Sequence, residues 1–153
     1  MRSRFLVLAA ALSLAAAAQP ASGADTVFKA TYKDLMLEDF DGRAIWELQA
    51  MCAGFHRATA AYWTGKGRRD RAREAQVASA RATNRVVHQL KRDRALGDRN
   101  EAIELAAPSE QVGWRITNEA LAKDGVSQDG QWNFWRSACI EVDRAFFAVN
   151  QGG

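Results

Sequence analysis

Two stretches of the chain carry apolar side chains at alternating steps of three and four residues, and each has a cysteine in its interior. This spacing places the side chains on one stripe of a helix. The first stripe consists of Ile45, Leu48, Cys52, Phe55, Thr59 and Tyr62, and the second of Trp132, Trp135, Cys139, Val142, Phe146 and Val149. The pattern predicts two long helices, one near each end of the folded domain, each with one buried face.

Helix start and stop signals indicate four helical regions in all. We expect them at about residues 41–64, 68–96, 99–123 and 129–149. Asp41 and Asp129 are the predicted N-caps of the first and the last helix. Pro108 is expected to interrupt the third region, because proline lacks the amide that a helix interior needs, and Ser109 is expected to cap a restarted helix.

The remaining segments have weaker patterns. The second helix is expected to bury a stripe of mostly small or polar side chains, Ala72, Gln76, Ser79, Thr83, Val86 and Leu90. In the third region we expect Val112, Ile116 and Ala120 to point inward. The lead-in over residues 25–41 is ambiguous: Phe28, Tyr32, Leu35 and Met36 suit a short helix packed on the body, but residues 26–32 suit an extended strand equally well.

Four helical regions with short connections, and no lasting strand-type alternation, predict an all-α fold, an up-down-up-down four-helix bundle. In this topology the first and last helices are antiparallel neighbours, so a disulfide between Cys52 and Cys139 can join them. Free thiols or a zinc site are the alternatives, but two cysteines without a nearby histidine pair are poor zinc ligands. The disulfide sets a register in which Ile45 lies near Phe146, Leu48 near Val142 or Asp143, Phe55 near Trp135, and Thr59 near Trp132.

The N-terminus has the pattern of a secretory signal peptide. Arg2 and Arg4 precede an apolar run from Phe5 to Ala18, and small residues lead up to Ala24. We predict cleavage after Ala24, which leaves residues 25–153 as a single domain. The apolar run is short of the about 20 residues that span a bilayer, so a transmembrane anchor in the mature form is not expected. The predicted destination, the periplasm or the medium, favours an oxidised cysteine pair.

Charge is concentrated in the second helix. The chain has 21 basic and 18 acidic residues, and loss of Arg2 and Arg4 with the leader lowers the basic count to 19. On a helical wheel, four arginines lie opposite the predicted buried stripe: Arg73, Arg81, Arg85 and Arg92. They form either a solvated face or a binding surface for an acidic protein or an anionic envelope component. A nucleic-acid partner is not expected, because no aromatic residues alternate with these arginines.

Five tryptophans suggest a second candidate surface. Trp46 begins a weaker stripe on the first helix, and Phe134 falls on the outer side of the last helix. Both residues either complete the packing or belong to a protein-binding patch, in which aromatic side chains often carry much of the binding energy.

The histidines are the candidate ligand-binding groups. His56 lies at the edge of the first stripe, and the register places it beside Trp132 and Trp135, so the three form a possible small-ligand or haem pocket. Met36 and Met51 are available as a second axial ligand. His88 lies among arginines and has no predicted role. No resident cofactor, metal site or covalent haem-attachment motif is expected.

The sequence contains no recognisable catalytic constellation. A disulfide would remove both thiol nucleophiles, and no Gly-x-Ser-x-Gly turn is present. Glu47 and Asp143 are the one conceivable carboxylate pair for hydrolysis of an envelope polymer. We therefore expect a non-enzymatic periplasmic interaction protein, with a small-ligand or haem-binding bundle as the first alternative and a hydrolase as the second.

Overall fold

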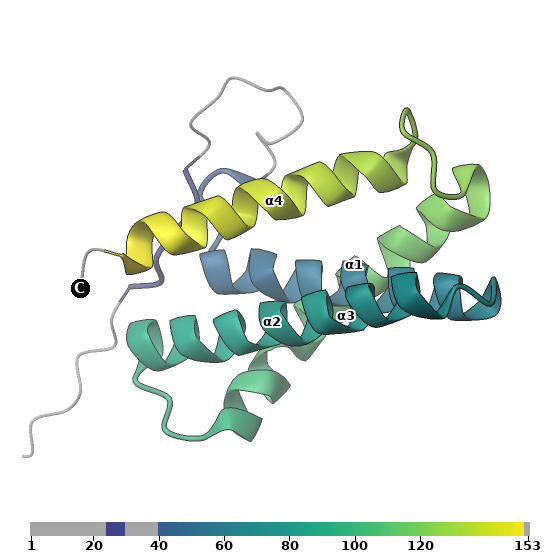
Figure 1. Ribbon diagram of the computed structural model, residues 1–153. Helices are drawn as coiled ribbons and strands as arrows, with labels where there is room; N and C mark the ends of the chain where they lie inside the picture. The colour runs from purple at the N-terminus through teal and green to yellow at the C-terminus, as the bar shows by residue number, and fades with distance from the viewer. Residues whose placement is uncertain (1–23, 30–39, 152–153) are drawn as a thin grey trace, which may run out of the picture.

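The computed structural model describes residues 24–29 and 40–151, which form four α-helices (Figure 1). They are α1 (Ile45–Gly65), α2 (Arg69–Arg94), α3 (Arg99–Asp124) and α4 (Gln131–Asn150). In Figure 1 successive helices run in alternating directions, and α3 crosses behind α1. Among the described residues, the only β-type pairing is an isolated bridge between Val27 and Ala44. The predicted all-α class and the four helices are confirmed.

α1 is the central helix of the fold, and it contacts each of the other three. Its apolar stripe packs against α4 in one core cluster, which also contains Phe28 and Phe40. The opposite side of α1 packs against α2 and α3 in a second cluster around Trp46, Val86 and Leu90. α1 is thus buried on two sides, which explains why only its ends and one narrow face reach solvent.

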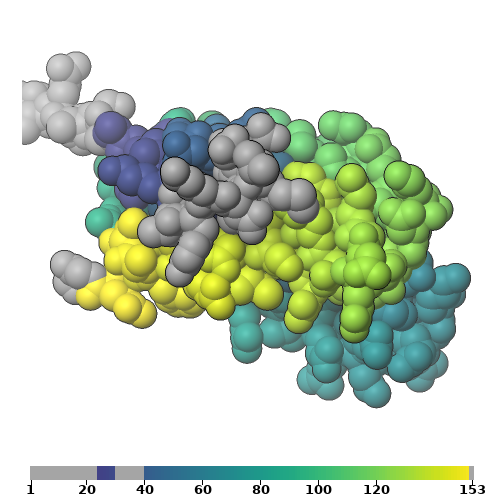
Figure 2. Space-filling model, turned by 90° about the horizontal axis from the view of Figure 1, so that it is seen from above, coloured from purple at the N-terminus to yellow at the C-terminus, as the bar shows by residue number. Residues whose placement is uncertain are grey.

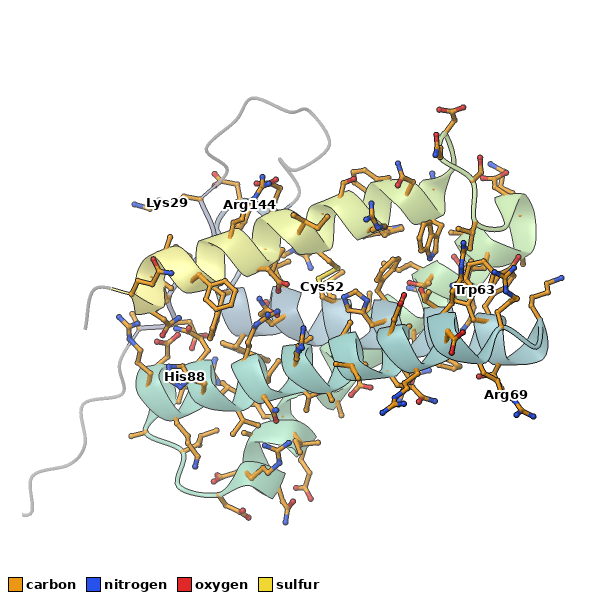
Figure 3. The ribbon with its side chains drawn as sticks, viewed as in Figure 1. Lys29, Cys52, Trp63, Arg69, His88 and Arg144 are labelled. Carbon is orange, nitrogen blue, oxygen red and sulfur yellow. A yellow bond between two sulfur atoms is a disulfide. The ribbon has the colours of Figure 1, made fainter. Side chains whose placement is uncertain are left out.

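The predicted disulfide joins α1 to α4. Cys52 and Cys139 are bonded with their Cα atoms 5.6 Å apart and are separated by 87 positions in the chain. Both are buried within the cluster between α1 and α4. Figure 3 shows Cys52 in the interval between these two helices. The bond therefore holds the outer helix of the fold to the central one.

The register between α1 and α4 agrees in part with the prediction. The Trp132 indole Nε1 donates a hydrogen bond to Thr59 Oγ1 at 3.0 Å, so the predicted neighbours do meet. Phe55 and Trp135 also lie close together, since both line one small apolar cavity beside the disulfide. The Phe55 ring lies directly against Trp132, with ring centroids 5.8 Å apart, and Trp135 packs against Phe40, also at 5.8 Å.

Glycines bring α1 and α3 into backbone contact. A Cβ atom built on Gly54 would lie 2.0 Å from the carbonyl oxygen of Glu110, and one built on Gly113 would lie 1.9 Å from that of Met51. No side chain fits between the two helices at this crossing. The close approach at Gly113 explains why the inner face of α3 is made of small residues, Ala106, Gly113, Thr117 and Ala120.

Residues 24–29, before α1, are extended, and residues 40–43 form a turn that leads into the helix. Phe28 is buried, and its amide donates to the Arg43 carbonyl at 2.8 Å. Thr26 donates from its amide and its hydroxyl to the carboxylate of Asp93, at 2.8 and 2.9 Å. The short-helix alternative is therefore wrong for residues 24–29, and Tyr32, Leu35 and Met36 lie outside the described residues.

Several predicted helix details are also wrong. α1 begins at Ile45 with Ala44 as N-cap, and Gly130 rather than Asp129 precedes α4. α3 runs through Pro108 without interruption, so Ser109 is not a cap. Pro108 and Glu104 lie on the exposed side of the helix, where water can reach the carbonyl that proline leaves without a partner.

The predicted buried stripes of α2 and α3 are partly confirmed, since Ala72, Val86 and Leu90 of α2 and Ala120 of α3 are buried. Gln76 of α2 and Val112 of α3 are exposed, whereas Ala75, Ala82 and Gln89 are buried. On α2 the close contact with α1 selects alanines, which the sequence pattern does not separate from the other small residues. The buried face of α2 is therefore broader than the predicted stripe.

Candidate ligand-binding groove

The N-terminal halves of α2 and α4 flank an open groove of about 640 Å³, with α1 as its floor. The floor consists of Phe55, His56 and Thr59. In Figure 2, α4 lies across this face of the molecule, and the segment around the α1–α2 turn emerges beside the start of α4. The walls are formed by Trp63, Arg68, Asp70, Arg71, Glu74, Ala75, Ala78, Val126, Trp132 and Arg136.

The space between α2 and α4 is open at the groove, and polar contacts bridge the two helices along the rest of it. Arg85 forms an ion pair with Asp143, which also accepts a hydrogen bond from Gln49 Nε2 at 3.0 Å. Further along, Arg92 donates to the Val149 carbonyl at 2.6 Å. Figure 3 labels both ends of this interval, with His88 at the closed end and Trp63 at the open end. The groove is therefore the part of the α2–α4 interval that no bridging contact fills.

His56 is the only titratable group on the floor of the groove. Its pKa is lowered to about 4, chiefly because burial disfavours the charged imidazolium; the nearby Asp143 carboxylate opposes this effect, and Arg85 adds to it. Its ring meets Phe55 edge to face, with centroids 5.1 Å apart. The described part of the chain offers His56 no hydrogen-bond partner. At neutral pH it is therefore a neutral imidazole with a nitrogen available to a ligand.

Aromatic rings and arginines surround His56. Trp132 is held in place by its hydrogen bond to Thr59 and by its contact with Phe55. At the open end, the Arg71 guanidinium lies 4.8 Å from the centre of the Trp63 ring. Three arginines and two acidic residues line the walls, so the formal charge of the groove is positive. This combination suits a ligand with a flat apolar body and an anionic group.

The structure brings together only part of the predicted ligand pocket. His56 and Trp132 share the groove, whereas Trp135, further along α4, lines a small apolar cavity of about 10 Å³ beside the disulfide. That cavity also touches Met51, which is therefore not beside His56 as an axial ligand. Met36 lies outside the described residues. Trp63 and Arg136 were missed, because neither lies on the stripe that the sequence pattern identifies.

The predicted arginine face is not one surface. Arg73 and Arg81 are exposed, but Arg85 and Arg92 turn toward α4 and bind it. Arg85 is partly buried between α2 and α4, whereas Arg92 is exposed and donates to the Val149 carbonyl. Of the four arginines, Arg73 and Arg81 are the two that are exposed and make no hydrogen bond to α4 among the described residues.

The predicted aromatic patch does not form either. Trp46 is 4% exposed and packs within the second core cluster, with the Arg94 guanidinium 5.2 Å from its ring centre. Phe134 is partly buried on α4, with its ring 5.1 Å from that of Trp135. The two residues therefore belong to different sides of the fold, and Trp46 is not available to a partner.

The carboxylates considered for hydrolysis are engaged separately. Asp143 binds Arg85 and Gln49. The charge of Glu47 instead adds to the effect of Asp25, which is the main cause of the raised pKa of the Arg94 guanidinium. Neither carboxylate lines the groove. Their placement gives the hydrolase hypothesis no support.

A second open groove of about 780 Å³ lies on the other side of α1, between it and α2. Its lining is mostly alanine, serine and threonine, and its one charged residue, Arg57, is paired with Glu110 at 3.0 Å and stacked on Trp114. It contains no histidine and no unpaired charge. The groove over His56 is the better candidate site.

Within residues 24–29 and 40–151 there is no group of three or more His, Cys, Asp or Glu side chains that could hold a metal ion. None of the helices described here is long and apolar enough to cross a membrane. Comparisons of the chain with protein-family models, curated proteins and solved structures find no match. The case for function therefore depends on the geometry of the groove.

The burial of His56 predicts a pH-dependent stability. Unfolding raises the His56 pKa from about 4 to the ordinary value of 6.5, so the unfolded chain binds a proton that the folded chain does not. Stability is therefore complete above pH 6.5 and falls as the pH drops toward 4. Between pH 7 and about pH 4.5 the free energy of unfolding should fall by about 2 kcal/mol through this residue.

Urea unfolding at the two pH values, for the native protein and for His56→Gln, measures this effect. The free energy of unfolding of the His56→Gln variant should lack the fall that His56 causes between these two pH values. Asp25, whose pKa is lowered chiefly by its hydrogen bonds with Arg94, destabilises the fold only at lower pH. An identical pH dependence in both proteins would contradict the buried, neutral state of His56.

Proposed function

We propose that this protein is a non-enzymatic, extracytoplasmic binding protein, and that the groove over His56 is its binding site. The observation that carries the proposal is a neutral imidazole without a hydrogen-bond partner among the described residues, in a groove that Trp63 and Trp132 also line. Arg68, Arg71 and Arg136 on the walls favour a ligand that carries negative charge. The extracytoplasmic location is supported by the disulfide and by the signal-peptide pattern that ends at Ala24.

The arginines on the outer face of α2 have a smaller role in this proposal than the sequence predicted. An anionic envelope component or an acidic partner remains the expected binding class, but contact through Arg85 and Arg92 would require breaking their bonds to α4. The groove offers charge and apolar surface together, which neither Arg73 nor Arg81 does alone. We therefore assign recognition to the groove rather than to the outer face of α2.

A fluorescent aromatic anion, 8-anilinonaphthalene-1-sulfonate, tests the site. The folded protein should bind one molecule saturably, and Ala78→Trp, which fills the groove from α2, should weaken binding about tenfold or more, since the added ring occupies the ligand's volume. Fluorescence titration measures the affinity, and circular dichroism checks that the variant remains folded.

Ala80→Trp is the matched control, because Ala80 lies on the same helix and lines the second groove. It should leave the affinity unchanged. Loss of binding in Ala80→Trp but not in Ala78→Trp would move the site to the second groove and contradict the proposal. Weaker binding in Arg136→Ala, with no change for the uncharged dye N-phenyl-1-naphthylamine, is expected if the arginine recognises the anionic group.

A further inference from the structure

The groove combines three features that an iron porphyrin requires of a protein. Haem is a flat apolar ring with an iron that takes an axial ligand and two carboxylates at one edge. Histidine is a common protein ligand of haem iron, and it binds as the neutral imidazole. Arginine is the residue best suited to pair with carboxylates. The deduction rests on the function proposed above and specifies its ligand.

The first feature is the axial ligand. His56 projects from α1 into the floor of the groove, and no hydrogen bond to the described residues occupies its ring nitrogens. The residues that face it from the neighbouring helices are Arg85 of α2 and Asp143 of α4, which are bound to each other. A metal ion bound by His56 alone would lack further protein ligands, since the described residues offer no cluster of them. A porphyrin supplies four nitrogen ligands itself, so one histidine is sufficient.

The second feature is the apolar surface for the ring. Trp132, Val126 and Ala78 line the groove and are partly exposed, and the Trp132 ring is backed by the buried Phe55 ring, with centroids 5.8 Å apart. Hydrogen bonding of Trp132 to Thr59 holds this surface in place. Ala75 and Ala78 on the facing side of α2 add no bulk that would obstruct a ring.

The third feature is the positive charge on the walls. Arg68 precedes α2 and Arg136 lies on α4, and neither has an acidic partner among the described residues. Both line the groove, as does Arg71. Asp70 and Glu74 also line it, so the arginines exceed the acids by one. This excess of positive charge favours a ligand whose edge carries negative charge.

We propose that the groove binds haem, with His56 as the axial ligand of the iron and with Arg68 and Arg136 facing its carboxylates. The binding is reversible coordination, and no covalent bond to the chain forms.

Titration of the disulfide-bonded protein with haemin and with metal-free protoporphyrin IX tests the assignment. Haemin should bind one to one with a sharpened Soret band, and more tightly than the metal-free ring. His56→Ala should lose the Soret shift and bind haemin about tenfold more weakly or worse, with unchanged affinity for protoporphyrin. His56→Gln, which keeps a polar side chain of similar size, should behave in the same way and guards against a folding defect in the alanine variant.

His88→Ala is the matched control, because His88 lies on α2 at the closed end and is bound to Asn150 at 3.2 Å. It should bind haemin like the native protein. A haemin spectrum and affinity unaffected by either His56 substitution would overturn the haem assignment, and so would equal affinity for haemin and protoporphyrin in the native protein. If the sulfonate dye binds in the groove while neither porphyrin does, the haem assignment fails and the binding function stands; if the dye also fails to bind, both fail.

Discussion

Gly113→Ala should destabilise the protein by about 3 kcal/mol, at the upper end of the usual cost of overpacking a core. The added methyl group would lie 1.9 Å from the carbonyl oxygen of Met51, and this neighbour is backbone rather than a flexible side chain. To make room, α3 must move away from α1 along the whole crossing. Gly54→Ala, on the other side of the same contact, should have a similar cost, with 2.0 Å to the Glu110 carbonyl.

Gly65→Ala is the matched control for this prediction. Gly65 is the last residue of α1, and a Cβ atom on it would meet nothing within 4 Å. This substitution should be neutral or slightly stabilising, because alanine has the higher helix propensity. Urea unfolding of the three variants measures the difference. Equal stability of Gly113→Ala and Gly65→Ala would mean that α1 and α3 do not cross with their backbones in contact.

The double substitution Cys52→Ala with Cys139→Ala should lower the free energy of unfolding by about 4 kcal/mol. The bond closes a loop between residues 87 positions apart, so its loss frees a large part of the unfolded chain. In the native state it also releases α4, which is held to α1 largely by apolar side chains around the bond. Chemical unfolding with and without the substitutions gives the difference.

Reduction of the native protein is the complementary measurement. The chain has two cysteines, so a reducing agent acts on this bond alone. The reduced native protein should unfold at about the same denaturant concentration as the double variant. An oxidised protein no more stable than the double variant would contradict a structural role for the disulfide.

The repeating apolar steps were sufficient to predict α1, α4 and their disulfide. Cys52 and Cys139 each lie at the centre of a long stripe, and large side chains on both stripes leave little choice of buried face. The same reasoning was only partly right for α2, whose central part is rich in alanine, serine and threonine: Val86 and Leu90 are buried as predicted, but Gln76 is exposed. There the buried side is decided by how closely α1 approaches, which a hydrophobic pattern does not express.

The errors at the candidate site have a related cause. Arg85 and Arg92 were placed on an outer face because their partners on α4, Asp143 and Val149, are far away in sequence. Trp46 was recognised as part of a second stripe, but the pattern alone does not show that a neighbouring helix covers that stripe. His56 and Trp132 were brought together correctly because the disulfide register fixes their relative positions.

The pattern of hydrophobic positions did not predict the buried polar contacts. Asp93 is buried near the end of α2, where it accepts hydrogen bonds from Thr26 and from Gln89 Nε2 at 2.9 Å. Gln89 in turn accepts from Asn150 Nδ2, also at 2.9 Å. These contacts join three parts of the fold: the segment before α1, the end of α2 and the end of α4. Each partner is a polar residue of a type that is usually exposed, so the sequence alone does not indicate its burial.

The measurement that tests the central claim most directly is a two-dimensional nitrogen–proton NMR spectrum of the five tryptophan indole groups during titration with the sulfonate dye. Trp63 and Trp132 line the groove, whereas Trp46 is buried in the second core cluster and Trp114 lines the second groove. If the groove over His56 is the binding site, the Trp63 and Trp132 signals shift saturably while those of Trp46 and Trp114 stay in place. A saturable shift of the Trp114 signal with no change in the Trp132 signal would contradict the assignment of the binding site to this groove.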